Sequence, residues 1–438
     1  MLFNNYLALV VVPLMASVGA QNYGADSLSL TITDMFERIE SDNRTMIVLR
    51  SAQEAAEEGI KAAKNAIYPE ISAEVNVSYI GDAFTTDRGF SNFAVAPSPH
   101  FGNGFTLDVQ QVIYAGGAVK AGVSLAQNQS TMTLAQTEKS RQDLRLLSVG
   151  QYLDLYKIAN NIKVYEENIS LTRKLIEEIR VRREQGLALA SDVTRYELRL
   201  EMLRLELVRL RNTEKILNYR LCSTLCLPSS TVIKPVLDEI EDIRSVSFVS
   251  WQSIATQSSP ELKMSDLNAK MASDQLALVR SEMLPKVALV AHESFNGPIT
   301  FEVPPIDKNL NIWYVGVGVK YNLSSLYKSS RKVRQSEVQM RLARERETVA
   351  EENLKNDVYQ AYMDYEQAYV ELDTRRKSLQ LADENYGRVY DRYMEQLALI
   401  TDMLDAFNMK LDAELGVSEA KAEILYRQCK LKYAAGVL

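Results

Sequence analysis

The stretch Leu187-Ala-Leu-Ala-Ser-Asp192 is nearly repeated 210 residues later as Leu397-Ala-Leu-Ile-Thr-Asp402. Each copy lies between two long segments of helical character, and Gly186 precedes the first copy. A hydroxyl residue followed by Asp suits the start of a helix, because the hydroxyl can cap free N–H groups and the carboxylate faces the positive end of the helix dipole. Each copy therefore predicts the tip of a helical hairpin, and the spacing predicts an internal duplication.

Long helices with coiled-coil periodicity are expected on both sides of each tip. Residues 118–185 and about 326–394 lead into the tips, and partner helices follow as far as Pro228 and Tyr433. Such a leading helix would reach on the order of 100 Å. Apolar residues recur every seven positions, as in a coiled-coil seam: Leu155, Ile162, Ile169 and Ile176 in the first half, and Val358, Tyr365, Leu372, Leu379, Tyr386 and Tyr393 in the second. An ordinary buried helix pair is the alternative, but it does not need such regularity.

An alternation of period two predicts one strand hairpin in each half, at residues 70–114 and 286–322. Pro69 and Pro285 end the helices that precede them. Residues 81–103 and 293–311 are expected to be long loops. The fourth strand is the clearest, and its apolar face consists of Trp313, Val315, Val317, Val319 and Tyr321. Trp313 and Tyr321, near its ends, are predicted to form an aromatic belt against lipid.

The remaining segments complete the expected domain plan. Residues 1–20 are interpreted as a signal peptide, because their apolar run is too short to span a bilayer and ends in small residues. The first repeat is expected to cover residues 21–225, with its helical hairpin at 118–221. The second is expected to cover residues 251–438, with its helical hairpin at 326–435. Residues 226–250 are interpreted as a linker, and residues 27–40, 45–67 and 260–283 as shorter helices.

Composition excludes several classes of function. The chain has 438 residues and a net charge of −7, and it shows no basic stripe that would bind nucleic acid. No nucleophile–base pair, metal-ligand spacing or phosphate-binding loop is apparent, so we expect no enzyme, no cofactor and no metal site. His100 and His292 stand alone. Cys222 and Cys226, four residues apart, could form a disulfide only if the helix end unwinds, so they are interpreted as buried thiols; the redox state of these two and of Cys429 is left open.

Four strands cannot close a barrel, since the smallest transmembrane barrels need about eight. A four-stranded sheet with exposed edges would also aggregate. We therefore expect an exported oligomer in which each chain contributes four strands to one shared barrel, with the helices forming a second cylinder beneath it. The predicted fold class is α plus transmembrane β, with mainly long antiparallel coiled-coil helices and two internal repeats.

These features together resemble the TolC-like outer membrane efflux proteins. The resemblance covers roughly residues 27–438 and rests on the order of the elements, the segment Asp108–Gly117, the two tips and the C-terminal segment Tyr433–Leu438. It implies a homotrimer with a twelve-stranded barrel in the outer membrane of a Gram-negative bacterium and a helical tunnel across the periplasm. It also implies a periplasmic adaptor protein and an inner-membrane pump of the RND, ABC or MFS type as partners. The transported substrate, the particular pump and the open or closed resting state stay undetermined.

The same resemblance assigns residues to the periplasmic aperture. Asp192, Tyr393, Asp402 and Asp405 match the family's aperture and gating positions. Six residues at the tips are expected to contact the adaptor: Gly186, Leu187, Ala188, Leu397, Ala398 and Leu399. The family's tip arginine falls on Ala398, so a different latch is expected, with Arg182, Arg183 or Arg392 as its donor.

Two simpler interpretations are kept beside this one. Asp192 and Asp402 could be helix caps and nothing more, although Asp405 lies a turn deeper, where capping explains it poorly. The whole chain could be a structural coiled-coil protein of the envelope without transport activity, which would explain the heptads but not the strand hairpins. The resemblance instead implies a passive, water-filled exit duct that is gated at the helical tips.

Overall fold

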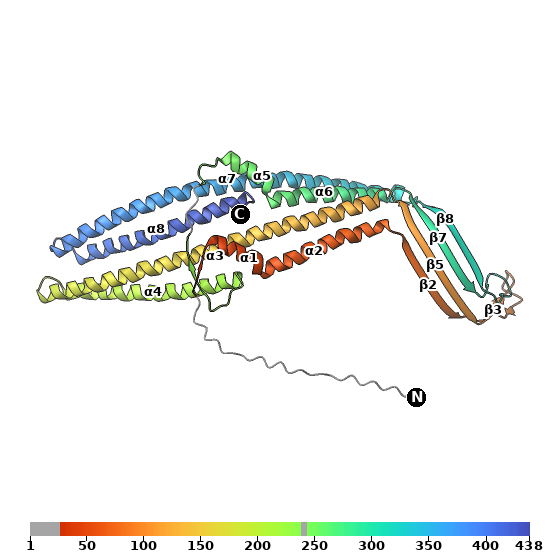
Figure 1. Ribbon diagram of the computed structural model, residues 1–438, viewed down its shortest axis with the longest axis horizontal. Helices are drawn as coiled ribbons and strands as arrows, with labels where there is room; N and C mark the ends of the chain where they lie inside the picture. Colours follow the sequence, from red (N-terminus) through yellow and green to blue (C-terminus); the bar gives the residue numbers. More distant parts are fainter. Residues whose placement is uncertain (1–26, 238–242) are drawn as a thin grey trace, which may run out of the picture.

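The computed structural model describes residues 27–237 and 243–438. The signal peptide predicted for residues 1–20 lies outside the described residues. In the described part, two very long helices extend from a sheet at one end of the molecule to two helical tips at the other (Figure 1). Within these described ranges, no helix has a stretch long and apolar enough to cross a membrane.

The sheet consists of β2 (Glu70–Tyr79), β5 (Phe101–Tyr114), β7 (Lys286–Gly297) and β8 (Leu310–Lys320), in the order β2-β5-β7-β8 with every neighbouring pair antiparallel. The hairpin from each half of the chain therefore joins the other along the β5–β7 pair. β2 and β8 form the two edges, and neither edge has a further partner among the described strands.

Strand register separates the two faces of the sheet, because directly opposed residues point to the same side. One row contains Ile71, Val109, Ala291 and Val315. The next row contains Ser72, Asp108, His292 and Tyr314. We call the face of the first row the apolar face and that of the second the polar face. Val315 on the apolar face is 64% exposed, so this chain alone does not cover that face.

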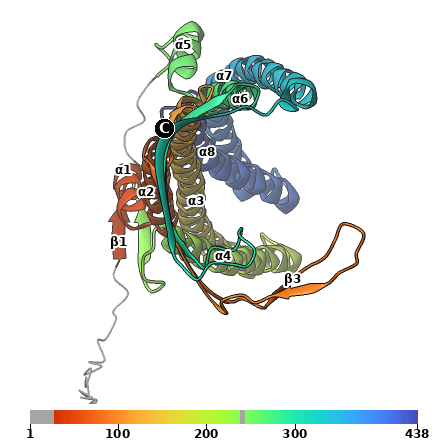
Figure 2. The same cartoon turned by 90° about the vertical axis from the view of Figure 1, so that its right-hand side faces the viewer.

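The long helices are α3 (Ala118–Glu184) and α7 (Ser325–Met394), which occupy the segments expected to lead into the tips. α4 (Ala190–Thr224) covers the tip half of α3, and α2 (Arg44–Lys64) covers its sheet half. α8 (Ile400–Ala434) and α6 (Pro260–Ser281) lie between α3 and α7 in the same end-to-end way. Viewed along the molecule, the helices form a curved layer (Figure 2).

The short elements follow local rules at their ends. After α2, the 3-10 helix η1 (Asn65–Ile67) ends before Pro69, and Pro260 occupies the first turn of α6 behind the Ser259 cap, whose hydroxyl accepts the N–H of Leu262 at 3.3 Å. The loop predicted for residues 81–103 contains a small hairpin of β3 (Ala83–Thr85) and β4 (Ala94–Ala96). The predicted second strand begins earlier than expected, at Phe101, because the glycine-rich residues 101–104 also pair with β2.

A band of small elements surrounds the middle of the long helices, and two expectations were wrong there. The helix expected from residue 27 is preceded by a strand, β1 (Ser27–Leu30), and α1 (Ile32–Asp42) begins only behind the Thr31 cap. The expected linker 226–250 contains β6 (Val232–Pro235) and the start of α5 (Phe248–Ser258). β1 and β6 pair in parallel across 205 residues, so neither strand has a local sequence signal.

Two buried clusters hold this band against the long helices. Met35 and Ile39 of α1 pack with Tyr152 and Val149 of α3, and Trp251 of α5 packs on α7 and α8. The Tyr152 hydroxyl lies 2.7 Å from the carbonyl oxygen of Leu30 and 2.6 Å from that of Val236, so it fastens the C-terminal end of the β1–β6 pair to α3.

The three cysteines are free. Cys222 is buried and Cys429 is half-buried; burial raises the pKa of the Cys222 thiol, and it raises the pKa of Cys429 to about 11. The interpretation of Cys226 as a buried thiol was wrong. α4 ends at Thr224, so Cys226 lies beyond the helix in a left-handed conformation with φ of 54° and is exposed.

Candidate functional site at the helical tips

The two tips share one backbone design. At the end of α3, the N–H of Leu187 donates to the carbonyl of Arg182 at 2.9 Å, and the N–H of Gly186 donates to that of Arg183 at 3.0 Å. The same two bonds close α7: Leu397 donates to Arg392 at 2.8 Å and Gln396 to Tyr393 at 3.0 Å. Both are Schellman motifs, which need a residue with positive φ just after the helix. Gly186 fills that position at 75° and Gln396 at 64°.

This difference between the tips leads to a prediction about stability. A left-handed conformation costs a residue with a Cβ roughly 1–2 kcal/mol, and glycine avoids this cost. Part of the benefit is offset because glycine loses more conformational entropy on folding than other residues. We expect Gln396→Gly to stabilise the second tip by about 0.5–1 kcal/mol, and Gly186→Ala to destabilise the first by ~1 kcal/mol. A Cβ at Gly186 would meet no atom within 4 Å, so only backbone conformation is tested. Thermal unfolding followed by circular dichroism measures both; shifts of the same sign would contradict this account.

The carboxylates, rather than the hydroxyls, cap the helices that leave the tips. α4 and α8 begin two residues earlier than the hydroxyl cap requires, with Leu189 and Leu399 at the N-cap. Asp192 therefore sits at the third helical position and accepts the N–H of Leu189 at 3.2 Å, and Asp402 accepts that of Leu399 at 3.1 Å. The expected hydroxyl caps at Ser191 and Thr401 were thus wrong. The last extended residue before each helix is a leucine, Leu189 or Leu399, so Ser191 and Thr401 already lie within the first helical turn.

Asp192 has a second partner that comes from the other half of the chain. The Tyr393 hydroxyl donates to Asp192 Oδ2 at 3.4 Å, and only 8% of Asp192 is exposed. Burial, followed by the charge of Asp192, raises the pKa of Tyr393 to about 12. The phenol therefore stays protonated and remains a donor at neutral pH.

Two further bonds connect α3 to the end of α7. The Arg182 guanidinium donates to the carbonyl oxygen of Met394, one of the carbonyls left free at the helix end, at 2.5 Å. The Tyr390 hydroxyl donates to Glu178 at 2.9 Å. We call the three contacts Tyr393–Asp192, Arg182–Met394 and Tyr390–Glu178 the tip bonds. Arg182 was one of the three arginines that the sequence analysis considered, but Glu178 and Tyr390 were missed. The Arg182–Met394 and Tyr390–Glu178 contacts each join residues 212 positions apart, close to the 210-residue spacing of the two tips.

An apolar core lies behind the tip bonds and joins the two hairpins. Ile176 and Ile179 of α3, Tyr196 of α4, and Met403 and Phe407 of α8 are all buried in it. Burial raises the pKa of the Tyr196 phenol far above its ordinary value. The two hairpins therefore pack as one body at the tips in this conformation.

The other expected site residues lie outside this network. Asp402 and Asp405 are exposed on α8. Leu187, Leu397 and Leu399 are 45%, 65% and 69% exposed at the ends of the tips, whereas the small side chains of Ala188 and Ala398 pack against the tip core. At the opposite end of the molecule, Trp313 on β8 is 70% exposed, and Tyr321, one residue beyond the end of β8, is 40% exposed.

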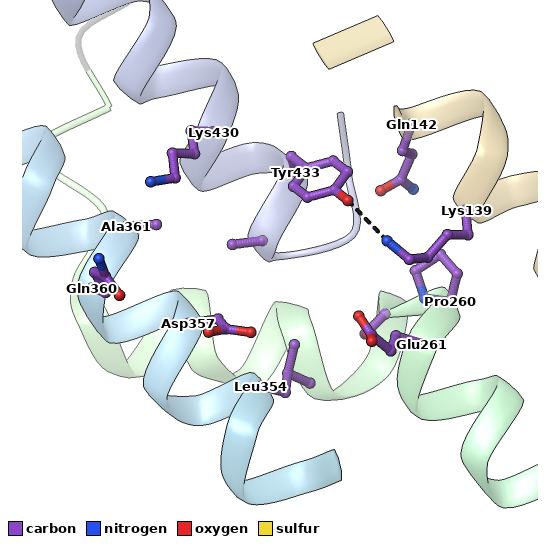
Figure 3. A pocket seen from close by; sticks show the side chains of 12 residues that line it. Lys139, Gln142, Pro260, Glu261, Leu354, Asp357, Gln360, Ala361, Lys430 and Tyr433 are labelled. Carbon is purple, nitrogen blue, oxygen red and sulfur yellow. Dashed lines mark hydrogen bonds between the residues drawn. The ribbon is translucent and has the colours of Figure 1, made fainter. Parts of the chain in front are cut away.

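A separate hollow lies at mid-length, where α6 begins and α8 ends (Figure 3). Its volume is about 240 Å³, and Lys139 and Tyr433 point toward one another across it with 2.8 Å between Nζ and the hydroxyl oxygen. Tyr433 also donates to Asp143 at 2.5 Å. These groups satisfy one another within the chain. In residues 27–237 and 243–438, no group of three or more His, Cys, Asp or Glu side chains is arranged to hold a metal ion.

Comparison with known proteins agrees with this architecture. The chain is 20% identical over 419 residues to the outer membrane efflux protein BepC of Brucella suis, covering 94% of this chain and 87% of that protein. The crystal structure of the outer membrane protein VceC of Vibrio cholerae superposes with a TM-score of 0.78 at 13% identity, covering 92% and 96% of the two chains. The CmeC outer membrane channel of Campylobacter jejuni gives 0.76 at 12% identity, covering 99% and 94%. At these identities the structures establish the fold.

Family membership follows from a different comparison. The family model described as outer membrane efflux protein matches residues 36–223 and again residues 251–437, which together make up most of the chain. This protein belongs to the outer membrane efflux protein family, the TolC-like channels of the Gram-negative outer membrane that extend into the periplasm.

Proposed function

We propose that three copies of this chain form the exit duct of a tripartite efflux or secretion system. Their sheets close one twelve-stranded barrel in the outer membrane, and their helices form a water-filled tunnel through the periplasm that is gated at the tips. The observation that carries this proposal is the four-stranded sheet, which has an exposed apolar face, a polar face and two unpaired edges. A sheet of this kind is stable in a membrane only when its edges are paired and the barrel is closed.

The two faces of the sheet suit lipid on one side and water on the other. The exposed apolar side chains share the face of Val315 and include Ile71, Val75, Val77, Trp313, Val317 and Val319. The opposite face carries Glu74, Asp108 and His292, and the His292 ring lies 2.7 Å from the Asp108 carboxylate. In a closed barrel the apolar face would contact lipid and the polar face would line the duct.

The helices support a role that reaches to partner proteins. With 67 and 70 residues, α3 and α7 each extend on the order of 100 Å from the sheet. We infer that the exposed leucines at the tips, Leu187, Leu397 and Leu399, contact a periplasmic adaptor, which would connect the duct to an inner-membrane pump. The pump would select the cargo, and the duct would conduct it passively.

Membrane extraction and bilayer conductance test the proposal. We expect the protein to stay in the outer membrane through buffer and high-salt washes, to be extracted by detergent as a trimer on light scattering, and to conduct ions in a planar bilayer. A chain that washes out in buffer as a non-conducting coiled coil would contradict the proposal and support a structural envelope protein instead.

We further propose that the tip bonds hold the tunnel closed, with Arg182 replacing the arginine that the family places at the position of Ala398. Tyr393→Phe, which removes one hydroxyl, is expected to raise the open probability of single channels. The Tyr393–Asp192 bond is long at 3.4 Å, so it should contribute toward the lower end of the usual 1.5–3 kcal/mol for a charged partner, or about tenfold in the equilibrium per chain.

Alkaline pH gives a second readout of the same bond. When the tips open, Tyr393 regains an ordinary pKa near 10, whereas in the closed tip it is about 12. The closed state therefore keeps this stabilisation below about pH 10 and loses it as the pH rises toward 12. Tyr393→Phe should weaken this alkaline opening, and the exposed Tyr327→Phe serves as the control. Equal open probabilities for the two variants and the unmodified protein would exclude Tyr393 from the gate.

The exposed acids of α8 are proposed to make the aperture cation-selective. Three copies of Asp402 and Asp405 around one axis would form a ring of carboxylates. Asp402→Asn with Asp405→Asn removes the charges, while the amide oxygen at residue 402 can still accept the N–H of Leu399. We expect the reversal potential in a KCl gradient to shift toward zero. An unchanged potential would leave Asp402 as a helix cap only.

A further inference from the structure

Four lysines meet where the sheet joins the long helix α7. Lys286 is the first residue of β7 and Lys320 the last of β8, and the two are directly opposite in the strand register. Lys328 and Lys332 follow on one face of the first turns of α7. All four line a cavity of about 880 Å³. We call them the junction lysines.

Their charges are poorly compensated. Like charges that face each other directly across two strands are destabilising. Lys332 has a counter-ion in Glu282, with 3.3 Å between the Lys332 Nζ and the carboxylate. In the part of the chain that the structure describes, none of the other three junction lysines forms an ion pair. The cavity lining therefore carries four positive charges and one negative charge, a net charge of +3.

The cavity lies on the polar face of the sheet and has space for a ligand. Most strand residues that line it belong to the polar face by register, namely Gln110, Lys286, Ala288, Val290, Gly318 and Lys320; Val319 of the edge strand β8 is the one lining residue from the apolar face. Gly318 and Ala288 line the wall between the lysines and the rest of the sheet. A Cβ built on Gly318 would come no closer than 3.8 Å to any atom. The glycine is therefore not needed to avoid a clash, and its lack of a side chain leaves the cavity open at this point.

We propose that the junction lysines form a binding site for multivalent phosphate-type anions inside the duct. This inference rests on the proposed function, because the polar face lines the lumen only in a closed barrel. Three clustered ammonium groups without counter-ions attract an anion carrying two or more charges far more strongly than chloride. Because the cavity opens on the polar face, the ligand is a free solute rather than a lipid headgroup. The duct would thus present carboxylates at its inner mouth and lysines where the tunnel enters the barrel.

Inorganic pyrophosphate is the probe for this site. We expect it to reduce the current through the reconstituted channel in a dose-dependent manner at low ionic strength, in bilayers of neutral lipid. Lys286→Gln with Lys320→Gln is expected to raise the half-blocking concentration at least tenfold. Gly318→Leu keeps all four lysines but fills the cavity, and it should have an effect in the same direction. Lys61→Gln, at an exposed lysine paired with Glu58 on α2, is the control and should leave the block unchanged.

A binding measurement makes the test independent of conduction. Line broadening in the ³¹P spectrum of pyrophosphate should appear with the detergent-extracted protein and be lost with the double lysine variant. Equal block and equal broadening for the double variant and the unmodified protein would overturn the site while leaving the duct intact. Block that requires anionic lipid would also overturn the site, because the lysines would then bind a lipid headgroup. Block that appears only after Glu70→Gln, on the other edge of the sheet, would overturn it too, because the lysines would then pair with a carboxylate of a neighbouring copy. Absence of a conducting trimer would instead contradict the proposed function.

Discussion

Val315→Arg is expected to abolish stable assembly in the membrane, whereas Gly316→Arg, one residue along the same strand, should be tolerated. Val315 lies near the middle of β8 on the apolar face. An arginine facing lipid at the middle of a barrel strand costs about 2–4 kcal/mol, and a trimer would bear that cost three times, or roughly 6–12 kcal/mol in total. This is comparable to the whole stability of an ordinary domain.

Gly316 provides a matched control because it belongs to the polar face, and a Cβ there would meet nothing within 4 Å. Both variants add the same side chain to the same edge strand. The trimer content of washed outer membranes, measured on semi-native gels, separates them. If both variants assembled equally well, the apolar face would not contact lipid and the proposed orientation of the sheet would be wrong.

Phe407→Ala is expected to loosen both tips at once. Phe407 is fully buried in the tip core, where it packs edge-on against Tyr386 with 6.2 Å between ring centroids and lies beneath the Arg199 guanidinium. Removing a buried phenylalanine side chain costs about 3–5 kcal/mol. Because α3, α4, α7 and α8 all contribute to this core, the cost applies to the packing of one hairpin on the other.

Trypsin reports such local opening, since Arg182 and Arg183 lie beside the first tip. When opening is faster than cleavage, the rate follows the population of the open form, so Phe407→Ala should accelerate cleavage there by about a hundredfold or more. Met409→Ala, at a 52% exposed position on the same helix, should change the rate little. Similar rates for Phe407→Ala and the unmodified protein would mean that the core does not hold the tips together.

Periodicity predicted the elements well because it reports a local property. Heptads at Leu155–Ile176 and Val358–Tyr393 lie within α3 and α7, since a seam of period seven specifies a helix and its buried face. Alternation likewise specified the faces of β8. Local rules failed where a competing local option existed: the leucine before each tip helix is already extended, so Asp192 and Asp402, rather than the hydroxyls, provide the cap.

The sequence by itself determined where the long helices, the four long strands and the two tips lie, because those depend on the spacing of apolar residues along a few turns or strand residues. Only the tertiary structure decided which distant segments meet: the parallel β1–β6 pair, the contacts of Glu178 with Tyr390 and of Arg182 with Met394, and the opposed lysines at the junction. A partner some 200 residues away is selected by the packing free energy of the whole chain. No periodicity within either segment records that selection.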